Sequence, residues 1–454
     1  MDLEPQALAP ATAVDFVEYY PINYIHETEP VHLYNEGGHH PVHIGDTLNS
    51  RFEVVHKLGN GGLGNVWLCR DTLKEKWRAV KITVADQLKK GTEMEVSRYL
   101  RSKFSQEELE RNHILPPLEE FSIVGPNGCH SCLVMPVYGP TVSEWRMFQE
   151  DHKKQADHDI RTVCRQIIES VQFLHGQRIC HGDLRPGNIL MQIQGIDDMS
   201  RDELLQLMGE PKHVRIRTLS GRPPAPRAPE YCVLPTDYSW AHKLTTASIA
   251  ITDFGESFFL KTLPGLFGIP YGYAAPEVLM PRIGPVGRHS DIWSLACTLF
   301  EVRNGSPLFA GDYDGELGRV LGDIQFYLGP LPKAQLGIQI STEFENLLKE
   351  KEDRSAEAKG RLLEESGYSD IFEAALGKEQ TMYLDWDRSD EVFKFRYPKD
   401  DVLGLADLLR GMLKYIPGDR VDIDGVLSHY WVKGIGKEGM PEEESRKGNA
   451  RTRH

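Results

Sequence analysis

The sequence predicts an α+β protein with two lobes, a small antiparallel β-sheet followed by a larger, mainly helical part. Between residues 52 and 84, short runs rich in β-branched and aromatic residues alternate with turn residues, as antiparallel strands do. Beyond residue 140, apolar residues recur at three- and four-residue steps, which is typical of amphipathic helices. A sheet-rich part therefore precedes a helix-rich part.

Four strand-like runs lie in the first part, at 52–58, 65–71, 77–84 and 131–137. The charged segment 91–103 is expected to be helical, and the apolar stripe of 159–176 predicts a core-facing helix. A shorter helix follows Ser200, because Glu203 completes a capping box and Gly209 comes just past its end. The first fifty residues suggest an extended arm, and the charged segment 333–390 a helical, partly mobile surface region.

Composition and charge exclude several classes of protein. Hydrophobic residues make up 40% of the 454 residues and charged residues 26%, which is ordinary for a globular chain. Lys and Arg total 52 against 67 Asp and Glu, a net charge of −15 that disfavours nucleic acid and anionic membranes and favours basic partners. No stretch approaches the roughly 18 apolar residues of a membrane span. We expect a soluble intracellular protein.

Cysteine usage points to a reducing compartment. The seven cysteines are odd in number and scattered, so they do not form the disulfide framework of a small secreted domain. Cys129 and Cys132 have a CxxC spacing, but no second pair follows at a zinc-ribbon distance. We interpret both as ordinary thiols.

The segment "LGNGGLGNVWL" contains Gly59, Gly61 and Gly64 in the GxGxxG spacing, followed by Val66. Glycines let a backbone approach phosphate oxygens without obstruction by Cβ atoms. Dinucleotide-binding turns share this spacing but lead into a helix, whereas a second strand follows here. The alternative is a glycine-rich hairpin that binds no ligand.

Lys81 lies in "RAVKI", between apolar neighbours that point to the other side of a strand. Together with the glycine loop it resembles the protein-kinase arrangement, in which this lysine holds the α- and β-phosphates of ATP and pairs with a helical Glu. We favour Glu95 as that partner, because apolar residues at plus one, plus four and plus five could seat it. Glu93 remains open, and an ordinary edge-strand lysine is the alternative for Lys81.

The segment "HGDLRPGNIL" places Asp183 where kinases carry the base that accepts the substrate hydroxyl proton, and Asn188 where they bind a magnesium ion. Asp253 follows in a DFG triplet and would bind magnesium as well. Further kinase-like segments come in the same order, namely "AAPEVL", "SDIWSLACTLFE" and "PGDRVDIDGVLSHYWV". The ordered matches make this chain similar to eukaryotic protein kinases over roughly 52–431.

The flanks resemble one kinase group. The leader at 34–71, "YNEGGHHPVHIGDTLNSRFEVVHKLGNGGLGNVWLCRD", is similar to that of the serine/arginine-rich splicing-factor protein kinases (SR-protein kinases). Asp253 lies 253 − 183 = 70 residues after Asp183, a spacer typical of this group, and "FYLGPLP" is similar to another of its segments. The spacer is short and has no low-complexity tract, as in compact fungal-type members.

The resemblance implies an ATP- and Mg²⁺-dependent enzyme that phosphorylates serines in Arg/Ser-rich proteins, and so a role in regulating mRNA splicing. Substrate would dock in an acidic groove, for which Asp312, Asp314 and Glu316 are candidates; an exposed acidic loop is the alternative. The implied catalytic residues are Lys81, Glu95, Asp183 and Arg185, and the implied metal ligands are Asn188 and Asp253. The implied ATP-binding residues are Leu58, Gly59, Asn60, Gly61, Gly62, Leu63, Gly64, Asn65, Val66, Lys81, Met135, Pro136 and Tyr138.

Some positions depart from the kinase pattern. Pro136 in the expected hinge lacks an N–H but keeps the carbonyl that adenine needs, and Tyr138 supplies the backbone donor. Gly182 replaces an arginine that binds activation-loop phosphate in many kinases, so we expect constitutive activity. Arg185 replaces a lysine that stabilises the transferred phosphoryl group, which would retune turnover. Ala274 precedes the "APE" triplet, at a position where the wider kinase group that contains the SR-protein kinases tends to have arginine.

The expected organisation is an N-terminal arm, a kinase domain with a spacer insert, and a charged tail. Their bounds are 1–51 for the arm, 52–431 for the domain (N-lobe about 52–137, C-lobe about 138–431, insert about 191–248) and 432–454 for the tail. We expect a monomer in the cytoplasm, the nucleus or both. The main alternative is a pseudokinase-like scaffold that binds ATP and a basic partner; a small-molecule kinase is disfavoured by Glu277, Asp291 and Arg420.

Overall fold

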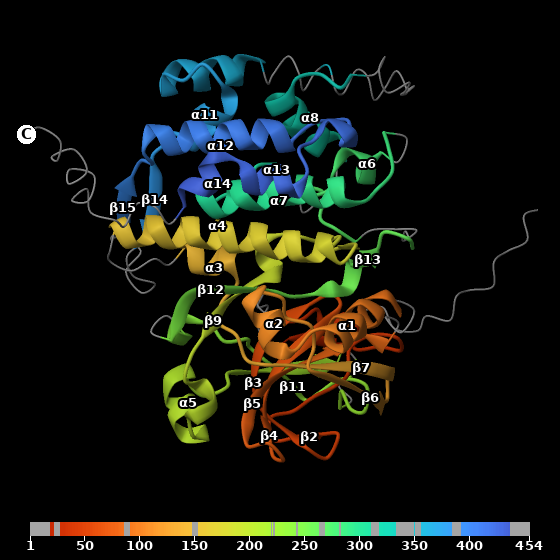
Figure 1. Cartoon of the computed structure of the whole chain (residues 1–454). Coiled ribbons are helices and arrows are strands. Elements are labelled where there is room, and N and C mark those ends of the chain that lie inside the picture. The colour runs from red at the N-terminus through yellow and green to blue at the C-terminus, as the bar shows by residue number, and fades with distance from the viewer. Residues whose placement is uncertain are drawn as a thin grey trace, which may run out of the picture. The chain divides into compact units, whose positions relative to one another are not determined.

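The computed structural model resolves the chain into two compact units, each built from three separate stretches of sequence (Figure 1). The smaller unit takes Met1–Gly91, Pro117–Gly139 and Ile193–Thr245, and the larger unit takes the remainder. The residues described are 19–21, 28–85, 91–147, 153–218, 220, 223–241, 244–262, 268–280, 283–309, 317–332, 349, 356–383 and 392–435.

A six-stranded antiparallel sheet forms the centre of the smaller unit, in the order β2-β3-β4-β5-β7-β6. The strands are β2 Thr47–Leu48, β3 Phe52–Gly61, β4 Gly64–Asp71, β5 Lys76–Thr83, β6 Glu119–Gly125 and β7 Gly128–Met135. The four predicted strands are confirmed as β3, β4, β5 and β7. β6 was not predicted, because its start is acidic and its side chains are mostly half-exposed.

Both faces of this sheet are covered by apolar side chains. Alternation along β5 sends Val80 and Ile82 into one cluster and Trp77 and Ala79 into another. Residues of the arm and the insert complete the first cluster, namely Val42, Leu48 and Val233. The insert also supplies Ile196, Leu204, Trp240 and Ala241 to the second. The insert is therefore part of the small-unit core.

The arm and the insert also pair with each other. A three-stranded antiparallel sheet joins β1 Tyr19–Pro21, β10 His213–Thr218 and β11 Tyr231–Val233 in the order β1-β10-β11. Beside it, Val31 in the short helix η1 (Val31–Leu33) packs in one cluster with Tyr34, Ile216 and Cys232. The expectation of a merely extended arm is therefore wrong for residues 28–50, which fold against the insert and the large sheet.

A buried ion pair ties the arm to β3. Lys57 is 0% exposed and its ammonium donates to the carboxylate of Glu29, which is 1% exposed. The hydroxyl of Tyr34 donates to the other oxygen of the same carboxylate. Burial would raise the pKa of Glu29, but the Lys57 charge and these hydrogen bonds outweigh it, so the pKa lies below its usual value.

The insert carries a helix whose start was predicted. In α5 (Arg201–Met208), the Ser200 side chain accepts from the Glu203 amide and the Glu203 side chain accepts from the Ser200 amide, which confirms the capping box. The short helix η4 (Ile196–Asp198) fixes this part to β5, since the indole of Trp77 donates to the Met199 carbonyl at 2.9 Å. A third short helix, η5, spans Ser239–Ala241.

Buried histidines of the arm predict acid sensitivity. His39 is 1% exposed, and neither of its ring nitrogens has a hydrogen-bond partner among the residues that the structure describes. The His40 ring lies 4.9 Å from that of His130. Burial lowers the pKa of His39 and of His40 from 6.5 to about 4. Between these pH values the unfolded chain binds more protons than the folded one, so stability is complete above pH 6.5 and falls towards pH 4.

Each of these histidines should cost up to about 1.4 kcal/mol of unfolding free energy per pH unit in that window. Thermal melts from pH 7 to pH 4 measure the effect. The double substitution His39→Gln with His40→Gln should flatten the decline, and an unchanged slope would contradict the assignment.

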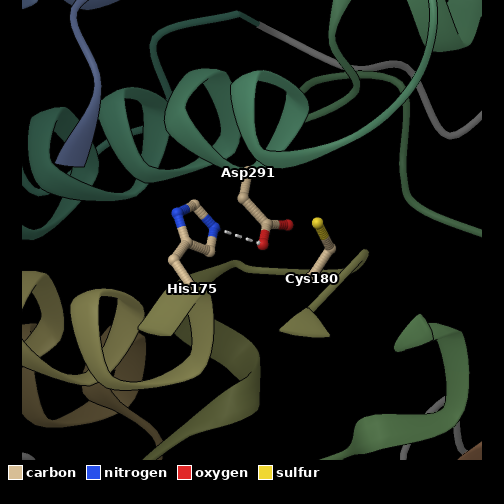
Figure 2. Close-up of side chains that lie close together, drawn as sticks. All are labelled: His175, Cys180 and Asp291. Carbon is tan, nitrogen blue, oxygen red and sulfur yellow. Dashed lines mark hydrogen bonds and ion pairs between the residues drawn. The ribbon is translucent and has the colours of Figure 1, made fainter. Parts of the chain in front are cut away.

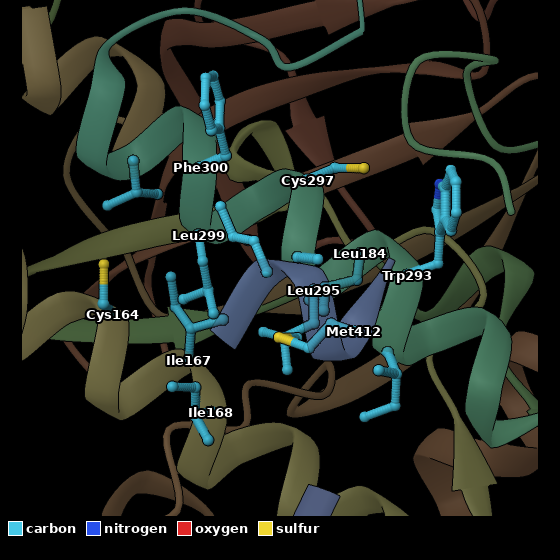
Figure 3. Packing of buried hydrophobic residues seen from close by; sticks show 14 of the residues in the cluster. Cys164, Ile167, Ile168, Leu184, Trp293, Leu295, Cys297, Leu299, Phe300 and Met412 are labelled. Carbon is cyan, nitrogen blue, oxygen red and sulfur yellow. The ribbon is translucent and has the colours of Figure 1, made fainter. Parts of the chain in front are cut away.

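The larger unit is helical, and α4 (Lys153–Gly176), α7 (Arg288–Asn304) and α12 (Lys399–Met412) run side by side in it (Figure 1). The predicted helices at 91–103 and 159–176 are confirmed as α1 and α4. Figure 3 shows apolar side chains of the core between these helices, including Ile167, Leu295 and Met412. α7 is buried on nearly all sides, since most of its side chains face the core.

The other elements of this unit are short. Its helices are α1 Gly91–Lys103, α2 Gln106–Arg111, α3 Val142–Met147, η3 Pro186–Asn188, η6 Phe254–Glu256, α6 Pro276–Leu279, α8 Leu317–Leu328, α11 Ile371–Leu376, η7 Pro417–Asp419, α13 Ile423–Ser428 and α14 Tyr430–Gly434. Its strand pairs are β8 Ile179–Cys180 with β13 Phe258–Phe259, β9 Ile189–Ile193 with β12 Thr245–Ile251, and β14 Gln380–Tyr383 with β15 Val392–Phe395.

The charged segment 333–390 is not wholly a surface region. Asp370 caps α11 by accepting from the amides of Phe372 and Glu373, and Ile371, Phe372 and Leu376 are buried in the core. Much of the rest of the segment lies outside the described residues. Among the helices that the structure describes, none combines the length and apolar character needed to cross a bilayer.

Candidate active site

The glycine loop is the hairpin between β3 and β4, with Gly61 opposite Gly64. Only Gly64 is required by the fold, because a Cβ there would overlap the Ile82 carbonyl oxygen. A Cβ at Gly59 or Gly62 would meet no atom within 4 Å, so packing does not explain these glycines. Open space above bare backbone is what a phosphate loop needs, and this favours a ligand over an empty hairpin.

Lys81 stands on β5, opposite Val66 of β4 and Leu133 of β7. It points to the same side of the strand as Ala79. That side carries an apolar wall of small-unit residues, which are Leu58, Val66, Ala79, Met135 and Val137. An ammonium at the edge of an apolar wall can hold phosphate while the wall receives a flat base. Pro136 and Tyr138, the other hinge candidates, directly flank Val137.

The expected partner of Lys81 is not supported by the burial of α1. Glu95 is exposed on this helix, whereas Val96 and Ser97 are 0% exposed. An exposed carboxylate does not favour a buried ion pair. The side chain of Glu93, the alternative, lies outside the described residues, so the two candidates are separated by experiment.

We expect Glu93→Gln to lower kcat/KM for ATP by about 10- to 100-fold, the worth of one charge-assisted hydrogen bond. The matched variant Glu95→Gln should leave it within about twofold, since that side chain is exposed. Steady-state kinetics at varied ATP concentration separates them, and the reverse order would restore Glu95.

The base candidate, Asp183, is 8% exposed and held on one side only. The Asn188 amide donates to its Oδ2 at 2.6 Å and to its backbone carbonyl at 2.8 Å, and Arg185 Nε lies 3.3 Å from Oδ2. Oδ1 has no hydrogen-bond partner among the described residues. Burial raises the pKa of Asp183, with a further contribution from Asp253, against the charge of Arg185. One free carboxylate oxygen is thus available to a hydroxyl.

Asn188 and Asp253 are brought together by paired strands. The Thr252 amide donates to the Asn188 carbonyl at 3.0 Å, where the β9-β12 pair ends. Asp253 has a left-handed backbone, φ 62° and ψ 70°. The Asn188 amide nitrogen donates to Asp183, so its Oδ1 is the atom that Asn188 can offer to a metal ion, and the Asp253 carboxylate follows one residue after Thr252. Hard oxygen donors of this kind fit Mg²⁺.

Asp291 braces the catalytic loop from behind. It accepts from the backbone amides of His181 at 2.8 Å and Gly182 at 3.0 Å, and its Oδ2 lies 3.0 Å from His175 Nε2. Figure 2 shows His175 and Asp291 with Cys180, the only buried group of metal-ligand type within the described ranges. Because these hydrogen bonds occupy Asp291, and burial raises the pKa of the Cys180 thiol, the group is structural.

A second buried pair fixes the segment that follows. Glu277 and Arg420 are bonded through both oxygens, at 2.6 and 2.7 Å, and both side chains are 0% exposed. Ser290 also donates to Glu277, at 2.7 Å. The sequence-predicted residues Glu277, Asp291 and Arg420 therefore all act as braces.

The backbone conformation and packing at position 182 require glycine, which was not predicted from the sequence. The φ of Gly182 is +80°, and a Cβ would overlap the carbonyl oxygen of Glu256. We expect Gly182→Arg to lose at least about 1–3 kcal/mol of unfolding free energy instead of restoring a phosphate contact. Gly176→Ala, where a Cβ meets nothing, is the control. Chemical denaturation measures both, and equal midpoints would contradict the steric argument.

A buried carboxylate near Arg185, that of Glu301, was not predicted from the sequence. Tyr273 donates to Glu301, and Ser143 Oγ donates to the same carboxylate at 3.1 Å. Burial raises the pKa of Glu301, and the Arg185 charge opposes this, so the two groups are in electrostatic reach. Glu301 closes "SDIWSLACTLFE", but no local pattern marks its role. It gives Arg185 an anionic neighbour besides Asp183.

Residues 52–201 and 241–432 match the family model described as the protein kinase domain. The chain belongs to the protein kinase family. The stretch between the two matched segments, 202–240, falls within the predicted insert. A solved crystal structure of another kinase domain has the same fold, with a TM-score of 0.51 and 21% identity over 87% of this chain and 98% of that one.

Curated relatives confirm the resemblance to SR-protein kinases. Human SRSF protein kinase 3 is 31% identical over 36% of this kinase, and the Caenorhabditis briggsae serine/threonine-protein kinase spk-1 is 32% identical over 39%. These matches span only 30% and 15% of the relatives' own lengths. The Physarum polycephalum serine/threonine-protein kinase SRPK is 25% identical over 90% of this kinase and 92% of its own length.

Proposed function

We propose that this chain is a serine/threonine-protein kinase that transfers the γ-phosphate of ATP to serines in Arg/Ser-rich proteins. The observation that carries the proposal is the carboxylate of Asp183. Its Oδ2 accepts a hydrogen bond from Asn188, and its Oδ1 accepts none from a described residue. The names of the relatives, which include SRSF protein kinase 3, support this choice of substrate. The net charge of −15 suits a basic partner.

A residue of this chain can be assigned to each role in the proposed phosphoryl transfer. Asp183 Oδ1 accepts the proton of the serine hydroxyl while the hydroxyl oxygen bonds to the γ-phosphorus. The bond from that phosphorus to the bridging β-phosphate oxygen breaks and ADP leaves, with its α- and β-phosphates held by Lys81. Asn188 and Asp253 would hold Mg²⁺, which neutralises charge on the phosphates. Arg185 places a cation beside the base, where the geometry keeps its Nε 3.3 Å from Asp183 Oδ2. The acidic docking candidates Asp312, Asp314 and Glu316 lie outside the described residues.

Constitutive activity is part of the proposal. The loop backbone is held by Asp291, a carboxylate of the fold itself, and Gly182 offers no side chain to an activation-loop phosphate. An enzyme built this way needs no phosphorylation of its own to order the catalytic loop.

The test uses radiolabelled ATP with Mg²⁺ and offers an Arg/Ser-repeat peptide, a generic basic protein or no substrate. We expect strong labelling of the repeat peptide, and the same rate after phosphatase treatment of the kinase. Equal labelling of both substrates would remove the Arg/Ser preference, and loss of activity after phosphatase treatment would remove constitutive activity. ATP binding without labelling of any substrate would favour a pseudokinase scaffold.

A further inference from the structure

A cavity of about 860 Å³ opens in the larger unit, among α2, α4, α7 and α13. None of the catalytic-loop residues 181–188 lines it, so it is separate from the proposed site of transfer. Its lining includes three arginines, Arg111, Arg178 and Arg288. The lining also carries three carboxylates, Glu169, Asp422 and Asp424, so the pairing of these charges decides what the cavity can bind.

None of the three guanidinium groups forms a hydrogen bond or ion pair with a carboxylate in the described part of the chain, although the charge of Arg111 acts on Glu108, one turn before it. Arg111 donates only to the backbone carbonyl of Glu107, at 3.3 Å, and Arg288 only to that of His175, at 2.7 Å. Arg178 makes no side-chain hydrogen bond or ion pair there. Arginines that line one cavity without anionic partners form an anion site, because their fork of N–H groups binds phosphate bidentately.

The carboxylates around the same cavity make their hydrogen bonds and ion pairs with other groups. Glu169 is paired with Arg165 at 2.8 Å, outside the lining. Asp422 accepts from the Gly425 amide at 2.8 Å, and Asp424 accepts from Gln172 at 3.2 Å. The Oδ2 atoms of Asp422 and Asp424 make no hydrogen bond to a described residue. They can receive cationic groups of a ligand.

His289 adds a second polar group to the wall. It lines the cavity, and its buried Nδ1 has no hydrogen-bond partner among the described residues. It follows Arg288, the first residue of the seventeen-residue α7, so two residues of the first turn of that helix line the cavity. The positive potential at a helix N-terminus favours phosphate oxygens near this turn.

We propose that this cavity binds a peptide in which phosphoserine alternates with arginine. Phosphoserine carries close to two negative charges for Arg111, Arg178 and Arg288, and its neighbouring arginines match the free oxygens of Asp422 and Asp424. The volume is that of a site for a ligand much larger than one phosphate ion. The choice of peptide rests on the proposed function, since such a peptide is the product of that reaction.

The test is direct binding of a synthetic, fluorescently labelled Arg–phosphoserine repeat peptide to the full chain without ATP, followed by anisotropy. We expect Arg111→Gln combined with Arg178→Gln to raise Kd at least about tenfold, the loss of one charge-assisted contact or more. The control is Arg361→Gln, because Arg361 is 65% exposed, lies outside the cavity and pairs within its own helix. It should leave Kd unchanged, and phosphotransfer to a generic basic protein should be unchanged in all variants.

Three outcomes would overturn the inference. They are equal Kd values for the arginine variants and Arg361→Gln, equal affinity for the unphosphorylated repeat peptide, and full displacement of the phosphopeptide by inorganic phosphate at the same concentration. The single variant Arg178→Gln controls for loss of folding, because the Arg178 side chain makes no hydrogen bond or ion pair with a described residue. Because the phosphopeptide is synthetic, failure of the kinase to label Arg/Ser peptides would refute the proposed function and leave this binding result standing.

Discussion

Asp183→Asn should lower kcat by about 10²- to 10⁴-fold while the Kd for ATP stays the same. The amide cannot accept the hydroxyl proton, yet it has the size of the carboxylate and can still meet Asn188 and the backbone. Oδ1 is the atom that matters, because Oδ2 is already bonded to Asn188 at 2.6 Å and Oδ1 is not bonded to any described residue. Labelled-ATP turnover and nucleotide titration measure the two quantities separately.

Asp202→Asn is the matched control, since it makes the same change at an exposed position on the insert helix α5. It should keep both kcat and the Kd for ATP. Turnover that survives Asp183→Asn would rule out Asp183 as the base. A large rise in the Kd for ATP would show instead that the side chain acts in nucleotide binding.

Glu29→Gln should destabilise the protein by about 3–5 kcal/mol, because it leaves the Lys57 ammonium buried without its counter-charge. Lys57 is 0% exposed, so water cannot replace the lost carboxylate. The Tyr34 hydroxyl loses a charged acceptor in the same change. Guanidinium unfolding, followed by tryptophan fluorescence, measures the loss as a lower midpoint.

Two variants sharpen this test. Glu29→Met combined with Lys57→Met removes both charges and keeps volume, so it should recover most of the stability. Lys76→Ala breaks an exposed pair in the same unit, with Asp197 at 3.4 Å, and should cost less than about 1 kcal/mol. If Glu29→Gln and Lys76→Ala cost the same, the buried pair does not hold the arm.

Local signals in the sequence predicted most of the fold. Alternation and helical periodicity are properties of neighbouring residues, so they located β3, β4, β5, β7, α1 and α4 within a few residues. The capping box of α5 was readable for the same reason, since Ser200 and Glu203 are three residues apart. The kinase motifs placed Asp183, Asn188 and Asp253 in order, and the structure brings Asn188 against Asp183 and Thr252.

Pairings between distant residues could not be predicted in this way. Glu29 and Lys57 are each ordinary surface-type residues, and only the folded arm turns them into a buried pair. The choice between Glu93 and Glu95 depended on which face of α1 is buried, and a charged helix with few apolar residues indicates this weakly. Glycine at 182 was understood only after Glu256 was found beside it.

The strand pairing of the arm with the insert also constrains how the chain can fold during synthesis. β1 and β10 are about two hundred residues apart in sequence, and the segment of the larger unit that holds α4 and the catalytic loop is made between them. The six-stranded sheet can form early, but the apolar cluster on one of its faces stays incomplete until Val233 of the insert has left the ribosome. High contact order of this kind slows folding and exposes apolar surface to aggregation. Truncation before the insert would therefore yield a nascent small unit that depends on chaperones.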